Sequence, residues 1–342
     1  LTVFFIFHSL LFILMQLSSQ SLLNKVNEHI EQMGYLHEPA NLYLPVRYVL
    51  SMGGKRLRPV LMLLAYNLYK DDVDTILDPA SGIEMYHNFT LLHDDLMDNA
   101  DMRRGKQTVH VKWNNNTAIL SGDVMLSLAD IYMSHCDDHY FRKVMETFSR
   151  TSVEIAEGQQ YDMDFENRDD VTEQEYIEMI RLKTSVLLAC SLKIGAILAG
   201  ASDEDAENLY KVGEQMGLAF QLHDDYLDVY GDPKVFGKKV GGDILCNKKT
   251  FLYVKSMKLA NDLQRRDLEH WFTTNDTDPL FSETKINAVT RIYTDLNMPE
   301  ICCTQEDNYY RCAHAYLDKV NVPDEAKAEL RAYLASMMNR NV

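Results

Sequence analysis

The residues best suited to chemistry lie in two acidic segments about 130 residues apart. Residues 91–98 read LLHDDLMD, and residues 221–228 read QLHDDYLD. In each segment the first and last aspartates are four residues apart, so on a helix both carboxylates lie on one face, about 5.4 Å apart along the axis. The apolar residues before each segment have helical spacing, which places the aspartates at two helix C-terminal ends. We expect the segments to be two halves of one site, facing each other across an apolar tunnel.

Aspartates grouped in this way repel one another. Two like charges 4 Å apart repel by about 4 kcal/mol at an effective dielectric of 20, and the carbonyl groups at a helix C-terminus add negative charge. Mg²⁺ relieves this repulsion, because it binds carboxylates together with substrate phosphates. A single DDxxD segment is most often a solvated acidic helix end. Two copies in the same His-Asp-Asp context favour a metal site, with His93 and His223 packed or hydrogen-bonded rather than acting as ligands.

Basic residues follow both acidic segments. Residues 103–106 read RRGK, residues 237–239 read GKK, and residues 53–59 read GGKRLRP. Arginine binds phosphate through paired hydrogen bonds, and lysine acts as a point charge. Each cluster alone could be a solvated loop, but two of them directly succeed an acidic segment, which favours a phosphorylated ligand. The sequence has neither a Walker A motif nor GxGxxG, so it lacks the usual cradle for nucleotide phosphotransfer.

The elements that must position these residues are helices. Glycine and proline together make up 15 + 8 = 23 of the 342 residues, which is few for a turn-rich all-β chain. Helical periodicity continues through nearly all of the sequence after Ser18, with short polar breaks. Length alone allows about two domains at roughly 150 residues each, but no flexible linker is apparent. We predict one all-α domain over residues 16–342 and an apolar N-terminal extension over residues 1–15.

Charge and cysteine usage exclude some partners and favour one compartment. A net charge of −17 repels a polyanion, so nucleic acid is a poor partner. Six cysteines without a CxxC pair indicate a reducing, cytoplasmic environment.

Residues 1–15 are too short to span a bilayer, and we interpret them as upstream of a natural start near Met15; a membrane-surface anchor is the alternative. No transmembrane span is expected after that point.

Seven motifs in a fixed order give the chain a family resemblance. They are GGKRLRP (53–59), DDLMD (94–98) with RRG (103–105), GQQYD (158–162), KT (183–184), QLHDDYLD (221–228), GKKVGGD (237–243) and NKKT (247–250). Together they resemble the trans-isoprenyl diphosphate synthases. The resemblance implies a single large all-α bundle around a deep central cavity, assembled as a homodimer. It also implies head-to-tail condensation of isopentenyl diphosphate with an allylic diphosphate, which can be dimethylallyl, geranyl or farnesyl diphosphate.

The resemblance further assigns roles to individual residues. Three Mg²⁺ ions, for which Mn²⁺ can substitute, would be held by Asp94, Asp98 and Asp224. The remaining aspartates of the two motifs would support them or act as further ligands: Asp95, Asp225 and Asp228. The allylic diphosphate would be bound by Arg103, Lys183 and Lys238, with Thr184 and Gln221 nearby. Isopentenyl diphosphate would be bound by Lys55, Arg58, His87 and Arg104, and Lys248 would close over the site.

Product length depends in this family on the residues before the first acidic motif. Aromatic side chains four or five residues before it limit chain growth, and these positions are Thr90 and Phe89. One aromatic residue without the two-residue motif insertion of bacterial farnesyl-type enzymes resembles synthases of C20 geranylgeranyl diphosphate, ahead of C15 farnesyl diphosphate. A longer-chain synthase is the alternative. The chain departs from the family at Gln107, where proline is frequent, and this leaves the shape of the basic loop open.

Three other functions compete with this interpretation. A class I terpene cyclase shares the first acidic motif but ordinarily lacks GGKRxRP and a second DDxxD. A non-catalytic subunit of a heteromeric synthase tends to lose the aspartates, and all six are intact here. A generic acidic cation-binding protein would leave the basic loops unexplained.

Overall fold

The computed structural model describes residues 17–34, 37–232, 240–274 and 278–338. Within these ranges the chain is almost entirely helical, and the two strands that occur have two residues each. The predicted all-α class is confirmed. The extension predicted over residues 1–15 lies outside the described residues.

The chain divides into two compact units, and the division falls within the helices α8, α10, α11 and α18. Unit 1 comprises Leu1–Ser149, Cys190–Tyr210 and Val320–Leu330, and unit 2 comprises Arg150–Ala189, Lys211–Lys319 and Arg331–Val342. One domain over residues 16–342 stays a prediction.

Unit 1 contains the first acidic motif at the end of its longest complete helix, α5. Its elements are α2 (Ser19–Gln32), α3 (Ala40–Leu50), α4 (Leu57–Tyr66), η1 (Val73–Ile76), α5 (Leu77–Met97), β1 (Met102–Arg103), β2 (Lys106–Gln107), α6 (Val109–Lys112), α7 (Asn115–Ser134) and η3 (Asp324–Lys327). The first turns of α8 (Asp138–Glu166) and α11 (Asp203–Tyr230), most of α10 (Val186–Ala199) and the start of α18 (Ala328–Met338) also belong to it.

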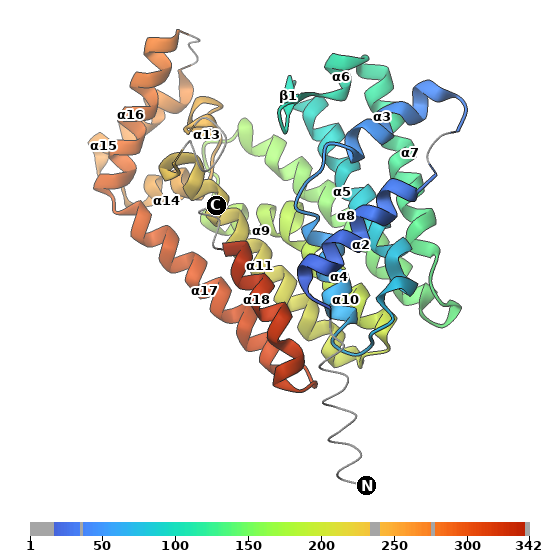
Figure 1. Cartoon of the computed structure of the whole chain (residues 1–342). Helices are drawn as coiled ribbons and strands as arrows, with labels where there is room; N and C mark the ends of the chain where they lie inside the picture. The colour runs from blue at the N-terminus through green and yellow to red at the C-terminus, as the bar shows by residue number, and fades with distance from the viewer. Residues whose placement is uncertain (1–16, 35–36, 233–239, 275–277, 339–342) are drawn as a thin grey trace. The chain divides into compact units, whose positions relative to one another are not determined.

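Glycines allow the helices around α5 to approach closely. Helix α5 packs along α7 (Figure 1), and a Cβ at Gly82 would lie 3.0 Å from the backbone nitrogen of Met133. At Gly122 of α7, a Cβ would lie 2.1 Å from Nε2 of His93. This nitrogen donates a hydrogen bond to the carbonyl of Ile119 at 3.2 Å. His93 is therefore packed and hydrogen-bonded, as predicted.

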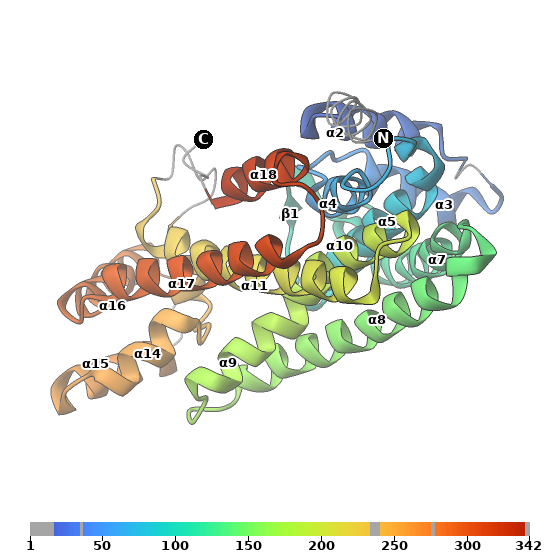
Figure 2. The ribbon, with the colours of Figure 1, turned by 90° about the horizontal axis from the view of Figure 1, so that it is seen from below.

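Unit 2 is built around a second apolar core. Its elements, besides the rest of α8, α10, α11 and α18, are α9 (Glu173–Ile180), the π-helix η2 (Arg181–Ser185), α13 (Gly242–Leu245), α14 (Phe251–Leu259), α15 (Asp262–Thr273), α16 (Pro279–Asp295) and α17 (Met298–Lys319). Figure 2 shows α16 beside α17, and these two helices pack together. Tyr176, Phe251 and Tyr293 are among the largest side chains of this core and are at most 1% exposed.

Short-range capping explains where several of these helices begin. Thr172 and Glu175 form a capping box at the start of α9, with each side chain bonding the other residue's backbone N–H. Asn261 and Gln264 form another at α15. Asp278 caps α16, whose first residue is the proline that suits this position.

One helical stretch among the described residues, Glu173–Ala199, is long and apolar enough to cross a membrane. However, 83% of its most apolar window is buried in the structure, as in a core helix.

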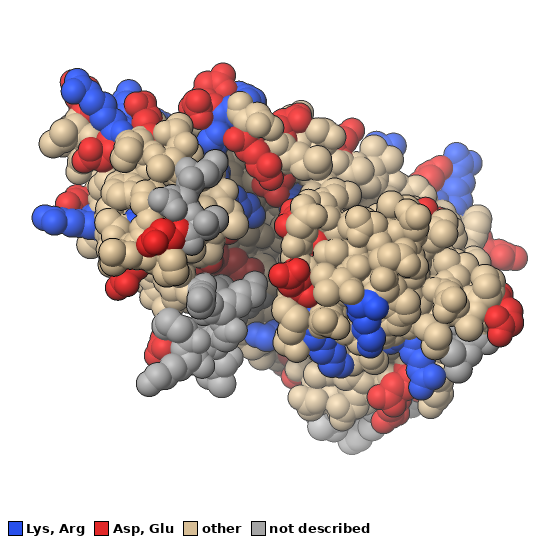
Figure 3. Space-filling model, turned by 90° about the horizontal axis from the view of Figure 1, so that it is seen from above, with Lys and Arg blue, Asp and Glu red and all other residues tan. Residues whose placement is uncertain are grey.

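The face of the molecule in Figure 3 carries scattered acidic and basic side chains among wide uncharged areas.

The close packing of α10 on α4 gives a test of the unit 1 core. A Cβ at Gly195 would lie 2.1 Å from the carbonyl oxygen of Met62, a backbone atom that cannot rotate away. We expect Gly195→Ala to lower the free energy of unfolding by about 1–3 kcal/mol because of overpacking. The control is Gly34→Ala, since nothing lies within 4 Å of a Cβ at Gly34. Equal melting temperatures for the two variants would contradict this packing.

Candidate active site

The first acidic motif ends α5 and divides its three aspartates into two kinds. Asp95 is buried, and its carboxylate accepts hydrogen bonds from Nε of Arg103 to both oxygens at 2.8 Å. Nη2 of Arg103 adds an ion pair at 2.7 Å. Asp94 is half-buried and Asp98 is exposed. The middle aspartate therefore neutralises its charge within the protein, whereas the outer two lie nearer to solvent.

Arg103 belongs to a short hairpin held by helix α3. Strand β1 pairs with β2 in antiparallel register, with Arg103 opposite Lys106. The hydroxyl of Tyr48 on α3 donates a hydrogen bond of 2.8 Å to the carbonyl of Gln107. The ammonium of Lys112 lies 3.6 Å from the centre of the Tyr48 ring, a cation–π contact that further orders this loop. The hairpin therefore keeps a defined shape with glutamine at the position where the family often has proline.

The GGKRLRP segment brings its arginines to the same region of unit 1. The guanidinium of Arg104 lies against Gly54, where a Cβ would lie 2.8 Å from Nη1, and Nη1 bonds the carbonyl of Gly53. Arg56 is buried in a left-handed conformation, with φ 48°, and donates to Glu84 at 2.8 Å. Sequence analysis did not assign Arg56 a site role, and its burial against Glu84 gives it a structural one.

Arg58 and His87 form the remaining polar pair of this cluster. Nη1 of Arg58 lies 3.1 Å from Nε2 of His87, and arginine can only donate, so this ring nitrogen accepts. Burial, together with the charges of Arg58 and Arg104, holds the pKa of His87 well below its ordinary value. His87 is therefore neutral at neutral pH. Lys55, three residues before Arg58, is exposed.

The two residues expected to limit product length lie on different faces of α5. Phe89 packs edge-on against Tyr86, with ring centres 5.4 Å apart, and against His93 at 4.9 Å. Both partners face neighbouring helices: Tyr86 packs against Phe148 of α8. Thr90 lies four residues before Asp94 and therefore shares its face of the helix.

The second acidic motif, in unit 2, repeats the division seen in the first. Asp225 is buried, and its carboxylate accepts from the hydroxyl of Tyr176, from Nε2 of Gln221 at 3.1 Å and from the backbone N–H of Phe251 at 3.4 Å. Burial and the nearby charge of Asp243 raise the pKa of Asp225 to about 7. Asp224 is half-buried.

The last aspartate of this motif fastens the following segment. Oδ2 of Asp228 accepts a hydrogen bond of 3.0 Å from the backbone N–H of Asp243, and its carbonyl accepts from Gly241 at 2.5 Å. His223 donates to Glu306 at 3.0 Å, so it too is hydrogen-bonded, as predicted. Asp225 and Asp228 thus hold residues 241–251 against α11.

Lys183 and Thr184 are presented by a π-helix packed between two glycines. A Cβ at Gly158 of α8 would lie 2.4 Å from the backbone nitrogen of Lys183, and a Cβ at Gly217 of α11 would lie 2.4 Å from Cα of Ser185. Single π turns inside helices frequently mark functional sites. The π-helix η2 therefore packs closely against α8 and α11 at two positions where glycine has no side chain to obstruct it.

The side chains on η2 meet further polar groups of unit 2. Nζ of Lys183 lies 2.6 Å from a carboxylate oxygen of Asp162, and Thr184 donates to Gln221 at 3.0 Å. Burial alone would raise the pKa of Asp162, but the charges of Lys248 and Lys183 outweigh it and hold this pKa below its ordinary value. The structure thus places Lys183 and Lys248 near Asp162, and Thr184 beside Gln221, and the roles of these residues toward a diphosphate stay predictions. Lys238 lies outside the described residues.

Sequence reasoning missed two residues of this half of the site. Asp162 ends the GQQYD motif, so its motif membership was the signal that could have singled it out. Tyr176, seven residues before Lys183, carries no comparable signal, because only the fold brings its hydroxyl to Asp225.

The donor set of the two motifs suits a hard divalent cation. Within the described part of the chain no group of three or more His, Cys, Asp or Glu side chains is arranged to hold a metal ion. Mg²⁺, however, is usually bound by one or two carboxylates and completes its octahedron with water and substrate phosphates. Asp94 and Asp224 are partly exposed and Asp98 is exposed, which meets that requirement.

Comparisons with known proteins agree with these local features. The family described as "Polyprenyl synthetase" matches residues 39–289. The geranylgeranyl diphosphate synthase of Methanosarcina mazei is 44% identical over 235 residues, which cover 68% of this chain and 72% of that protein. The geranylfarnesyl diphosphate synthase of Natronomonas pharaonis is 40% identical over 258 residues, covering 70% and 75%.

Solved structures show the same fold. A crystal structure of a geranylgeranyl pyrophosphate synthase matches with a TM-score of 0.91 and 42% identity, covering 95% of this chain and 99% of that one. The geranylgeranyl pyrophosphate synthase of Corynebacterium glutamicum, complexed with isoprenyl diphosphate and magnesium, matches with a TM-score of 0.81 and 25% identity, covering 94% and 98%. The resemblance drawn from the motifs is confirmed, and the chain belongs to the polyprenyl synthetase family of prenyltransferases.

Proposed function

We propose that the chain condenses isopentenyl diphosphate head-to-tail with an allylic diphosphate in a Mg²⁺-dependent reaction, and that its main product is C20 geranylgeranyl diphosphate. The main support for this proposal is that the middle aspartate is buried in both acidic motifs, whereas other aspartates of the motifs are more exposed. In each motif the middle aspartate, Asp95 or Asp225, is buried under donors of the protein. The outer carboxylates Asp94, Asp98 and Asp224 are less enclosed, which suits ligands for cations shared with a diphosphate.

Three Mg²⁺ ions would be held by Asp94, Asp98 and Asp224, with Mn²⁺ able to substitute. When bound, they neutralise negative charge on the allylic diphosphate and favour its departure. The proposal requires the two motifs to act on one diphosphate, and family membership supports this.

The protein's cations would bind the two substrates separately. Arg103, Lys183 and Lys238, with Thr184 and Gln221, would orient the allylic diphosphate, and Lys248 would close over it. Lys55, Arg58 and Arg104 would bind the diphosphate of isopentenyl diphosphate. Neutral His87 would donate through the ring nitrogen that does not face Arg58. Such preorganised donors stabilise charge that develops as the leaving group departs.

The reaction itself needs little acid–base chemistry from the protein. The bond between C1 of the allylic substrate and its diphosphate oxygen breaks, and the double bond of isopentenyl diphosphate attacks the resulting allylic cation. A proton then leaves C2 of the isopentenyl unit for the released diphosphate. Exclusion of water matters here, because water would quench the cation.

We propose that Phe89 limits the length of the prenyl product, because its ring packs against Tyr86 and His93. A braced ring resists displacement by a growing hydrocarbon, which favours a defined product length. The relative that makes a geranylfarnesyl product supports C25 as the second candidate. A non-catalytic subunit is disfavoured, since both motifs keep all their aspartates.

We also propose a cytoplasmic homodimer. Three apolar residues of α7, Ile119, Leu120 and Ile131, are 44% to 58% exposed, which supports an interface at this helix. All six cysteines are free thiols, which supports a reducing compartment.

The first prediction tests the metal ligands. Asp94→Asn and Asp224→Asn should each lower kcat by about 100-fold or more, because each removes charge that binds the cations. The measurement is incorporation of labelled isopentenyl diphosphate at several Mg²⁺ concentrations, with circular dichroism to check folding. Asp101→Asn, an exposed acid near the first motif, is the control and should keep full activity. Wild-type turnover in either motif variant would rule out the assignment.

The second prediction tests product length. Phe89→Ala should shift the products to longer chains, because it removes the braced ring. Products formed from C5, C10 and C15 allylic diphosphates are separated by chain length. Phe141→Ala on the exposed side of α8 serves as the control. An unchanged product profile for Phe89→Ala would place the limit at another residue.

A further inference from the structure

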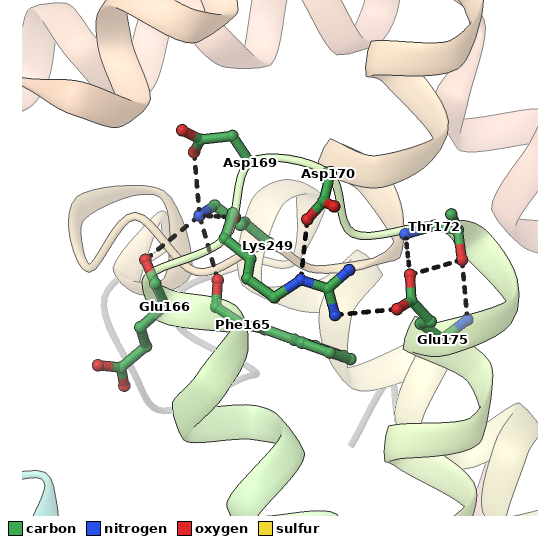
Figure 4. A network of polar contacts seen from close by, with 8 residues as sticks. Phe165, Glu166, Asp169, Asp170, Thr172, Glu175 and Lys249 are labelled. Carbon is green, nitrogen blue, oxygen red and sulfur yellow. Dashed lines mark hydrogen bonds and ion pairs between the residues drawn. The ribbon is translucent and has the colours of Figure 1, made fainter.

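Lys249 is a buried lysine that the proposed chemistry does not use. It lies in the four-residue segment Asn247–Thr250, between α13 and α14, and its side chain is 6% exposed. Its ammonium group lies 3.1 Å from the carbonyl oxygen of Phe165 and 3.2 Å from that of Glu166, and it also contacts the carbonyl of Arg168 (Figure 4). An ion pair with Asp169 at 3.3 Å completes its surroundings.

These contacts cap the C-terminal end of α8. The last carbonyl groups of a helix have no partner within the helix and carry partial negative charge, so a cation stabilises them. An ammonium group has three N–H donors, and here three carbonyl oxygens receive them. Lys249 is therefore fully engaged within the protein and is not a substrate-binding cation.

The neighbouring lysine, Lys248, lies in different surroundings. Lys248 is half-buried, and its charge lies close enough to Asp162 to lower the pKa of that carboxyl. Its backbone is fixed on both sides, since its N–H donates to Asp243 at 2.9 Å and its carbonyl accepts from Thr250 at 3.0 Å. Asn247, directly before it, adopts a left-handed conformation and accepts from Lys285.

The two lysines connect the same two elements. Asp162 lies on α8 three residues before Phe165, within one turn of the carbonyl groups that Lys249 binds. Lys249 therefore ties the chain at Lys248 to the end of the helix that carries Asp162. Asp162 in turn pairs with Lys183 at 2.6 Å.

We propose that Lys249 is a positioning residue, which by capping α8 fixes Lys248 relative to Asp162 and Lys183. This inference rests on the proposed function, in which Lys248 and Lys183 act on the allylic diphosphate. Its physical basis is that a misplacement of about 1 Å in a catalytic group can cost about 100-fold in rate. Loss of the cap frees the segment at one of its attachments and removes the ammonium donor from the carbonyl groups of Phe165 and Glu166 at the end of α8.

A second lysine of the same unit provides a matched control. Lys255 of α14 pairs with Glu173 at 2.8 Å and 2.9 Å, so it too ties two segments together. It is six residues after Lys249 and belongs to no motif that we assign to substrates. Lys255→Met therefore removes a comparable internal tie without touching the attachment of Lys248.

The experiment compares kcat, both KM values and melting temperature for Lys249→Met, Lys248→Ala, the double variant and Lys255→Met in the full-length chain. Lys249→Met should lower kcat about 10-fold or more, with KM for isopentenyl diphosphate unchanged. In the Lys248→Ala background the same substitution should cause no further loss of kcat. Lys255→Met should lower the melting temperature and leave kcat unchanged.

Two outcomes overturn the proposal while the proposed function stands. In one, Lys248→Ala lowers kcat but Lys249→Met behaves like Lys255→Met. In the other, Lys249→Met lowers kcat by the same factor with and without Lys248, as a general loss of stability would. If Lys248→Ala keeps wild-type kcat, the assignment of Lys248 fails and this inference fails with it. Should Lys249→Met not fold, Lys249→Gln replaces it under the same criteria.

Discussion

Repulsion among carboxylates near helix ends is the constraint on which both halves of the site depend. Each DDxxD segment places three carboxyl groups where backbone carbonyl groups already carry partial negative charge. The protein relieves part of this repulsion itself by burying the middle aspartate under donors, Arg103 for Asp95 and Tyr176 with Phe251 for Asp225. Of the outer carboxylates, Asp228 accepts a backbone hydrogen bond, and Asp94, Asp98 and Asp224 are the ones that we propose as cation ligands.

The hydrogen bonds of these aspartates also position the surrounding segments of the chain. Because Asp95 binds Arg103, it also orients the hairpin that carries Arg104 against Gly54. Because Asp225 and Asp228 bind backbone N–H groups, they hold the segment that carries Lys248. Aspartates that the motifs group together thus also hold the protein's own segments in place.

The helical class and the family could be predicted from the sequence, because periodicity and motif order are local properties. The buried roles of Tyr176 and Lys249 could not. Each depends on a contact about 50 or more residues away along the chain, with Asp225 and with the end of α8. The π-helix η2 was not predicted either, and its close packing against Gly158 and Gly217 involves residues on two other helices.

The contact between Tyr48 and the carbonyl of Gln107 has a consequence for protein engineering. A proline restrains a loop through its own ring, whereas here the restraint comes from a different helix. The basic hairpin is therefore not a self-contained module. A chimera that receives residues 101–108 without α3 would contain the arginines but would lack the contact from Tyr48 that orients the hairpin.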